Sequence, residues 1–253
     1  MKDIKEKYSV PVFQNINILK DIEYAVAKIG EHNEKLLLDV YSPFDGTANK
    51  RPAIVWIHGG GFKMGIDKSQ NYIVRLAIEF AKKGFVSFSI NYRVRNDPYG
   101  DMLGSLKDAV NDAIASINFI RHNWDKYKIN KNKIILAGGS SGGMIATNLC
   151  LLNKKAPQWN KSKILGLVNL WGSPGTSMML DKIYEDFPPT LIIHGTDDHT
   201  IPYSQSEGLV RELKRKNIEC VFCSIHGAYH TPVKYLDEII NCIAKFIYNK
   251  LGN

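Results

Sequence analysis

A short segment rich in glycine and serine contains the residues best suited to nucleophilic chemistry. Residues 138–143 read GGSSGG, after an apolar run of strand type and before a run of helical type. A strand that turns sharply into a helix brings backbone segments into close contact, so it requires glycine on both sides of the turn. A serine at the apex projects its hydroxyl toward helical N–H groups that favour negative charge. The pattern G-x-S-x-G therefore predicts a nucleophilic serine.

Ser140 and Ser141 both satisfy this five-residue pattern. We predict that Ser140 is the nucleophile, because it directly follows the glycine pair and leaves the N–H of Ser141 to bind an oxyanion. Ser141 stays the alternative nucleophile. The competing interpretation is that the segment is only a polar loop, since short motifs recur by accident.

A second glycine cluster follows the apolar run at 53–57, which is typical of a strand buried on both faces. Residues 58–62 read HGGGF. Consecutive glycines let backbone N–H groups approach a ligand closely, and beside a nucleophilic serine they supply part of an oxyanion hole. A phosphate-binding loop is the rival interpretation, but the lysine and Ser/Thr of a P-loop are missing. We interpret His58 as a hydrogen-bonding brace for this loop.

Two adjacent aspartates are candidates for the acid of a catalytic triad. Asp197 and Asp198 follow a strand-like run that ends in His194 and Gly195. We predict Asp198 from the spacing H-G-x-x-D. Either aspartate could instead be a turn residue, since aspartate side chains bond their own backbone in turns.

Several histidines could serve as the base. His226 and His230 follow the last predicted strand, while His194 and His199 flank the candidate acids. We predict His230, because it follows the small residues 227–228 and precedes the closing helix, where its imidazole can reach over the serine. The chain order Ser, Asp, His is that of the α/β-hydrolase triad.

Strand-like and helix-like segments position these residues. Strands are predicted at 19–29, 36–41, 53–57, 85–90, 134–137, 164–170, 190–193 and 220–225. Helices are predicted at 71–83, 103–124, 144–152, 204–216 and 233–251. The first two strands flank a turn at 30–33 and predict an antiparallel hairpin. From residue 53 the alternation predicts a mostly parallel sheet with helices on both faces, whose strand ends bring the candidate residues to one edge.

Composition points to one soluble α/β domain spanning residues 1–253, with a loosely ordered lead-in at 1–17. Hydrophobic residues make up 44% of the 253 residues, and the net charge is +8. The lysines are dispersed, with no basic stripe interleaved with aromatics, so we expect a solvated surface and no nucleic-acid partner. No run approaches the ~18 apolar residues of a membrane span, and the N-terminus lacks a signal-peptide pattern, so we expect a cytoplasmic protein.

The four cysteines show no zinc-site spacing. Cys220 and Cys223 form a C-x-x-C within a strand, where residues three apart face opposite sides. No second pair or suitably spaced histidine accompanies them. We predict buried free thiols and no metal site.

Five motifs together resemble the α/β-hydrolase superfamily, in particular esterases of the hormone-sensitive-lipase and feruloyl/acetyl-esterase (BD-FAE-like) type. The similarity runs from about residue 20 to the C-terminus. The matching motifs are His58-Gly59-Gly60-Gly61, Asn91-Tyr92-Arg93, the turn at 138–143, His194-Gly195-x-x-Asp198 and Gly227-Ala228-x-His230.

The resemblance implies an α/β-hydrolase fold and hydrolysis of small-molecule esters of acetyl, other short-chain or feruloyl acids. The chain departs from the family pattern in lacking a long N-terminal cap and a large insert after the strand at 164–170, so we expect a minimal cap. It implies a triad of Ser140, Asp198 and His230, with the N–H groups of Gly60, Gly61 and Ser141 as the oxyanion hole. No metal or organic cofactor is expected, and no oligomeric state is predicted. Ser141 stands where such enzymes often have alanine.

Two other functions fit the same pattern. An amide hydrolase of this fold, an arylformamidase or a small peptidase, would use the same triad. A non-catalytic ligand receptor on a hydrolase scaffold is the third possibility, although such proteins tend to lose a triad member.

Overall fold

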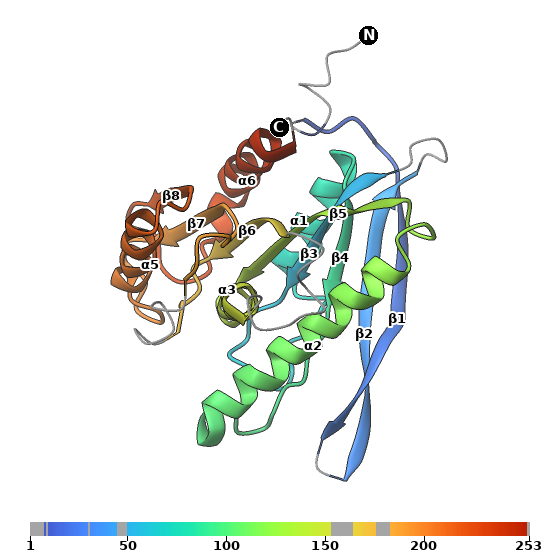
Figure 1. The fold of residues 1–253 in the computed structure, drawn as a ribbon, viewed down its shortest axis with the longest axis horizontal. Helices are drawn as coiled ribbons and strands as arrows, with labels where there is room; N and C mark the ends of the chain where they lie inside the picture. Colours follow the sequence, from blue (N-terminus) through green and yellow to red (C-terminus); the bar gives the residue numbers. More distant parts are fainter. Residues whose placement is uncertain are drawn as a thin grey trace.

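The computed structural model describes residues 8, 10–29, 31–44, 50–152, 164–175 and 183–251. Within these residues an eight-stranded sheet has the order β1-β2-β4-β3-β5-β6-β7-β8 (Figure 1). The strands are β1 (Ile16–Ile29), β2 (His32–Pro43), β3 (Arg51–Ile57), β4 (Val86–Ile90), β5 (Ile129–Gly139), β6 (Ile164–Leu170), β7 (Thr190–Gly195) and β8 (Cys220–Ile225).

Strand direction follows the predicted pattern. β1 pairs antiparallel with β2, and β2 pairs antiparallel with β4. Every other neighbouring pair, from β4–β3 to β7–β8, is parallel. The predicted mostly parallel sheet with an N-terminal antiparallel hairpin is confirmed, and the carboxyl ends of the parallel strands share one edge.

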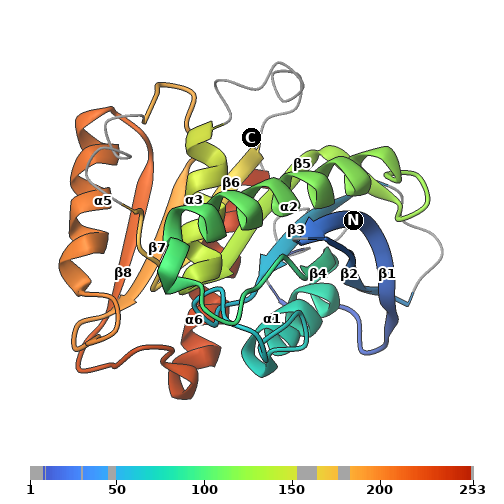
Figure 2. The same cartoon turned by 90° about the horizontal axis from the view of Figure 1, so that it is seen from below.

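Helices cover both faces of this sheet. They are α1 (Asn71–Lys82), α2 (Met102–His122), α3 (Ser141–Leu152), α5 (Tyr203–Arg215) and α6 (Leu236–Leu251). Helices α2, α3 and α5 lie on one face, and α1 and α6 lie on the other (Figure 2). None of the helices in the described ranges is long and apolar enough to cross a bilayer.

The two faces have separate hydrophobic cores because side chains alternate along each strand. In β3, Val55 and Ile57 belong to the core beneath α2, α3 and α5. Ile54 and Trp56 belong to the core beneath α1 and α6. A strand buried on both faces must be apolar at every position, which explains the continuous run at 53–57.

Of the predicted lead-in at 1–17, the structure describes residues 8 and 10–17. Strand β1 already begins at Ile16. Before it, the amides of Val12 and Phe13 both donate to the carbonyl of Lys82, 2.9 Å away in each case. The Tyr8 ring lies 5.0 Å from the ring of Phe85. The described part of the lead-in is therefore held against the end of α1.

The prediction of free thiols is wrong for two of the four cysteines. Cys223 on β8 is joined by a disulfide to Cys242 on α6, while Cys150 and Cys220 are free. As predicted, residues 220 and 223 face opposite sides of β8, since Cys220 packs against one core and Cys223 against the other. The disulfide partner of Cys223 lies on α6, which packs on the face of the sheet toward which Cys223 points.

Candidate active site

Ser140 occupies a tight turn between β5 and α3. Its φ is 56°, in the left-handed region that side chains other than glycine rarely adopt. The Ser140 amide donates to the carbonyl of Leu170 on the neighbouring strand at 2.9 Å, and its carbonyl accepts from the amide of Met144 at 3.0 Å. These backbone bonds hold the strained turn in place and leave the hydroxyl free to project from it.

The glycines around Ser140 are required by close backbone contacts. A Cβ on Gly142 would lie 2.1 Å from the carbonyl oxygen of Ile57, and one on Gly138 would lie 2.4 Å from Gly142 itself. Helix α3 begins at Ser141, three residues before the predicted start, so its first turn includes Gly142 and Gly143. Glycine is a weak helix former, but here tertiary packing outweighs that preference.

Three predicted side chains meet at the carboxyl edge of the sheet. The Nε2 atom of His230 lies 2.9 Å from the Ser140 hydroxyl oxygen. On the other side of the ring, Nδ1 lies 2.7 Å from Oδ2 of Asp198. A carboxylate can only accept, so Nδ1 carries the proton and Nε2 is free to accept the serine proton.

Asp198 is held by backbone groups as well. Its side chain is fully buried, and Oδ1 accepts from the amides of Thr200 at 2.8 Å and Ile201 at 2.9 Å. Burial by itself raises the pKa of Asp198, but the hydrogen bonds from His230, Ile201 and Thr200 outweigh it and hold the pKa below its usual value. Asp198 is therefore a carboxylate at neutral pH.

The alternative acid lies outside this arrangement. Asp197 is exposed, and its carboxylate accepts from the hydroxyl of Thr196 at 2.9 Å. Of the other histidines, His226 and His199 are also exposed, and His199 lies beside the ring of Tyr229. In the described structure none of these three side chains hydrogen-bonds to Ser140 or Asp198.

The glycine loop lies against the turn at Ser140. Gly60 and Gly61 have φ values of 106° and 63°, as expected for a loop that turns its amides toward a ligand. The Gly61 amide donates to the hydroxyl oxygen of Ser141 at 3.0 Å. The Gly60 amide has no acceptor among the described residues, and the Ser141 amide opens α3, where N–H groups lack intrahelical acceptors. Two of the three expected oxyanion donors are thus free, and the third is bonded to the Ser141 side chain.

Tyr92 connects this loop to the turn. Its hydroxyl donates to the carbonyl of His58 at 3.1 Å and lies 3.3 Å from the Ser141 hydroxyl. The N-Y-R motif after β4 is part of the family resemblance, but no role for Tyr92 was predicted from it. Its position at the carboxyl end of a buried strand could have indicated that it lies in the site. Nothing in the sequence indicated this for Gln70, whose side chain accepts from the Gly59 amide at 2.9 Å.

His58 is placed as the predicted brace. Its Nδ1 donates to the carbonyl of Gly59 at 2.7 Å, and its ring stacks on Tyr92 with centroids 4.3 Å apart. The side chain is buried, and Nε2 has no hydrogen-bond partner in the described structure. This burial lowers the pKa of His58 from 6.5 to about 4, so the ring is neutral at pH 7.

The buried neutral His58 predicts a loss of stability in acid. Between pH 6.5 and about 4 the unfolded chain binds a proton at His58 that the folded chain does not, so acidification favours unfolding. Relative to His58→Gln, the wild-type protein should lose about 2–3 kcal/mol more of its unfolding free energy between pH 7 and 4.5. Urea unfolding at the two pH values measures this difference. His122→Gln, which removes an exposed imidazole, is the control and should behave like wild type; equal losses in wild type and His58→Gln would contradict the prediction.

No group of three or more His, Cys, Asp or Glu side chains in the described ranges could hold a metal ion.

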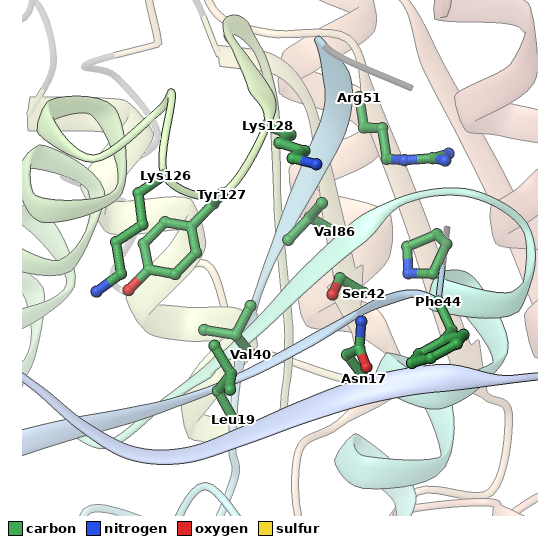
Figure 3. Close-up of a pocket in the computed structure, with 11 residues that line it drawn as sticks. Asn17, Leu19, Val40, Ser42, Phe44, Arg51, Val86, Lys126, Tyr127 and Lys128 are labelled. Atoms are coloured by element: carbon green, nitrogen blue, oxygen red, sulfur yellow. The ribbon is translucent and has the colours of Figure 1, made fainter. Parts of the chain in front are cut away.

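A cavity of about 290 Å³ lies at the other end of the sheet (Figure 3). Arg51 and Val86 open β3 and β4, and Lys128 immediately precedes β5, so this cavity lies at the amino ends of the strands. Its lining includes neither the triad residues nor the glycine loop.

Two family models match the chain in succession. The BD-FAE model matches residues 38–167, just over half of the chain, and the prolyl oligopeptidase family model matches residues 176–253. The first range includes the glycine loop and the serine turn. The second includes Asp198 and His230.

Curated relatives are similar over most of this chain. A probable isoprenylcysteine alpha-carbonyl methylesterase of Oryza sativa is 24% identical over 80% of the chain and 56% of the relative. Esterase LipC of Mycobacterium tuberculosis is 26% identical over 77% of the chain and 56% of the relative. The chain spans about half the length of the curated relatives it matches.

Solved structures share the fold. A truncated carbohydrate esterase from gut microbiota superposes with a TM-score of 0.74 at 21% identity, covering 98% of each chain. Thermogutta terrifontis esterase 2, phosphonylated by cyclosarin, has a TM-score of 0.72 at 22% identity, covering 92% of this chain and 94% of its own. At this identity the likeness establishes the α/β-hydrolase architecture.

Proposed function

This chain belongs to the BD-FAE family, and from that premise we propose that it hydrolyses carboxylic esters through an acyl-enzyme formed on Ser140. The observation that carries the proposal is the continuous hydrogen bonding from Ser140 through His230 to Asp198. These residues are 90 and 32 positions apart in sequence, so their contact depends on the whole fold. The esterase names of the curated relatives are consistent with the same chemistry.

In the first step the Ser140 oxygen attacks the ester carbonyl while Nε2 of His230 takes the serine proton. Asp198 keeps the imidazole in the tautomer that can accept this proton and stabilises the charged ring. His230 then gives the proton to the leaving alcohol. Water repeats the sequence on the acyl-enzyme, with His230 again acting first as base and then as acid.

The oxyanion of each tetrahedral intermediate would be held by backbone N–H groups. The free amides of Gly60 and Ser141 are the first two donors. The Gly61 amide becomes the third when the Ser141 hydroxyl turns away from it. One donor of this kind is typically worth about 10²–10³ in rate.

Apolar side chains border this loop and suit the hydrocarbon part of an ester. Ile66 is 38% exposed, and its Cβ lies 2.8 Å from where a Cβ on Gly60 would be. Tyr99 is 63% exposed, and its hydroxyl lies equally near a Cβ built on Gly61. We propose small esters of acetyl, other short-chain or feruloyl acids as the substrate class.

Covalent labelling tests the nucleophile directly. A fluorophosphonate should phosphonylate wild-type protein at Ser140, because the serine activated by His230 attacks phosphorus as it attacks an ester carbonyl. The Ser141→Ala variant should still be labelled, and the Ser140→Ala variant should not. Peptide mass mapping locates the adduct. An adduct on Ser141, or none on the wild-type protein, would contradict the proposal, and the latter would favour a non-catalytic receptor.

The match to the prolyl oligopeptidase family favours one second candidate, an amide hydrolase with the same triad. Matched aryl esters and aryl formamides separate the two functions. We expect higher kcat/KM on the ester. Higher kcat/KM on the formamide would assign the chain to amide hydrolysis with the same residues in the same roles.

A further inference from the structure

A second histidine contacts the same carboxylate oxygen as His230. His194, near the end of β7, is completely buried, and its Nε2 lies 3.0 Å from Oδ2 of Asp198. The same nitrogen lies 3.0 Å from the carbonyl oxygen of Ile201. The other ring nitrogen, Nδ1, lies 2.6 Å from the hydroxyl of Ser206 on α5. The contacts thus form a series of five side chains: Ser140, His230, Asp198, His194 and Ser206.

The partners determine where the protons of this series lie. Nε2 of His194 faces a carboxylate and a carbonyl, both of which can only accept, so Nε2 carries a proton. Burial lowers the pKa of His194, which keeps the ring neutral and leaves Nδ1 unprotonated. Nδ1 therefore accepts from the Ser206 hydroxyl. Ser206 is buried, and its hydroxyl occupies Nδ1, so both ring nitrogens of His194 are hydrogen-bonded.

Asp198 accordingly receives four hydrogen bonds. The two on Oδ1 come from backbone amides and fix the plane of the carboxylate. The two on Oδ2 come from the imidazoles of His194 and His230. A hydrogen bond to Oδ2 stabilises its negative charge, so the N–H of His194 weakens the attraction that the same oxygen exerts on a protonated His230.

We propose that His194 is a positioning residue that orients the Asp198 carboxylate and moderates its charge toward His230, with Ser206 holding the other side of the His194 ring. This inference rests on the proposed function. His230 must take a proton from Ser140 and then release it to the leaving alcohol. An Asp198 carboxylate stabilised only by backbone amides would hold that proton on His230 more firmly, and the contact with His194 limits this effect.

Few other groups lie close enough to His194 to change its hydrogen bonding or its charge. Besides Asp198, Ile201 and Ser206, the structure places the Tyr203 ring 5.8 Å from the imidazole. The Tyr203 hydroxyl is bonded to Ser224 and not to His194. Among the described residues, His230 and Asp198 are the titratable groups that act electrostatically on His194.

The main variant is His194→Leu, which keeps an apolar volume and removes the donor to Oδ2. The acidic limb of kcat/KM against pH should move to higher pH by about half a unit to one unit, since His230 then stays protonated over a wider range. At the pH optimum kcat should fall about tenfold with KM nearly unchanged, because the loss affects proton transfer and not substrate binding. A merely structural role would lower the amount of folded enzyme without moving this limb.

Two further variants separate the donor from the packing. In His194→Gln the side-chain amide can reach the position of Nε2, so the limb should return toward its wild-type position. Ser206→Ala keeps His194 but removes the hydrogen bond that holds the other side of its ring, so the donor to Oδ2 is less well oriented and the limb should shift upward by less than in His194→Leu. The control is Tyr203→Phe, which keeps the ring near His194, removes only a hydroxyl that is bonded to Ser224, and should leave the pH profile unchanged.

A readout without turnover distinguishes this inference from the proposed function. In Ser140→Ala protein, NMR of labelled imidazoles follows the protonation of His230, and adding His194→Leu should raise the midpoint of that titration. An upward shift supports the inference even if no ester is hydrolysed. An unchanged midpoint and pH profile in His194→Leu, or a downward shift, would overturn it. If that variant does not fold, Ser206→Ala decides the question by the same two measurements.

Discussion

Replacing Ser140 with alanine is expected to lower kcat for ester hydrolysis by about 10⁶-fold, to near the uncatalysed background. The variant keeps the glycine loop and the Asp198–His230 pair but removes the atom that forms the acyl-enzyme. Because the triad acts as a unit, the remaining members should contribute little by themselves. Hydrolysis of a short-chain aryl ester, followed at fixed pH with purified protein, measures the loss.

Ser141→Ala is the matched control for this experiment. It removes the neighbouring hydroxyl, which is bonded to the Gly61 amide and lies beside Tyr92, but keeps the Ser141 backbone N–H. We expect less than about a tenfold change, the effect of losing one neutral hydrogen bond. Retained activity in Ser140→Ala together with an inactive Ser141→Ala would move the nucleophile by one residue.

Replacing Asp198 with asparagine is expected to lower kcat by about 10⁴-fold. An asparagine side chain fits the same space, but its amide can turn its NH₂ group toward His230. The imidazole then carries its proton on Nε2 and cannot accept the proton of Ser140. The ring of His230 also loses the negatively charged carboxylate that stabilises its protonated form. The pH dependence of kcat/KM for the variant measures both losses.

The adjacent aspartate supplies the control. Asp197 is exposed and bonded to Thr196, so Asp197→Asn should change kcat by no more than about twofold. The opposite ranking of the two variants would show that Asp197 is the acid. Circular dichroism on both variants verifies that neither loss reflects unfolding.

The proposed site and the fold depend on one another. The left-handed φ of Ser140 is maintained by backbone bonds to β6 and α3, and the close contact of Gly142 with the β3 carbonyl keeps the glycine loop beside the turn. Asp198 is held by the loop between β7 and α5. The geometry of the proposed site is therefore set by backbone hydrogen bonds and close packing, and few side-chain torsions need to be fixed when substrate binds.

Local patterns in the sequence were sufficient to predict the fold class, the strand-turn-helix segment and the loops in which the site residues lie. Apolar periodicity and glycine position are properties of neighbouring residues, so they can be read from the chain directly. They also favoured Ser140 over Ser141 as the predicted nucleophile and Asp198 over Asp197 as the predicted acid. The order of the motifs placed each of them after a strand of the parallel sheet.

Only the tertiary structure decided which member of each pair faces His230. Adjacent residues in a turn point in different directions, and which one points inward depends on backbone torsions that distant elements impose. The same reason explains why the Gly61–Ser141 bond, the contact of His194 with Asp198 and the Cys223–Cys242 disulfide were not predicted. Each of these contacts involves groups whose relative position follows from the packing of several helices and strands, which no local pattern encodes.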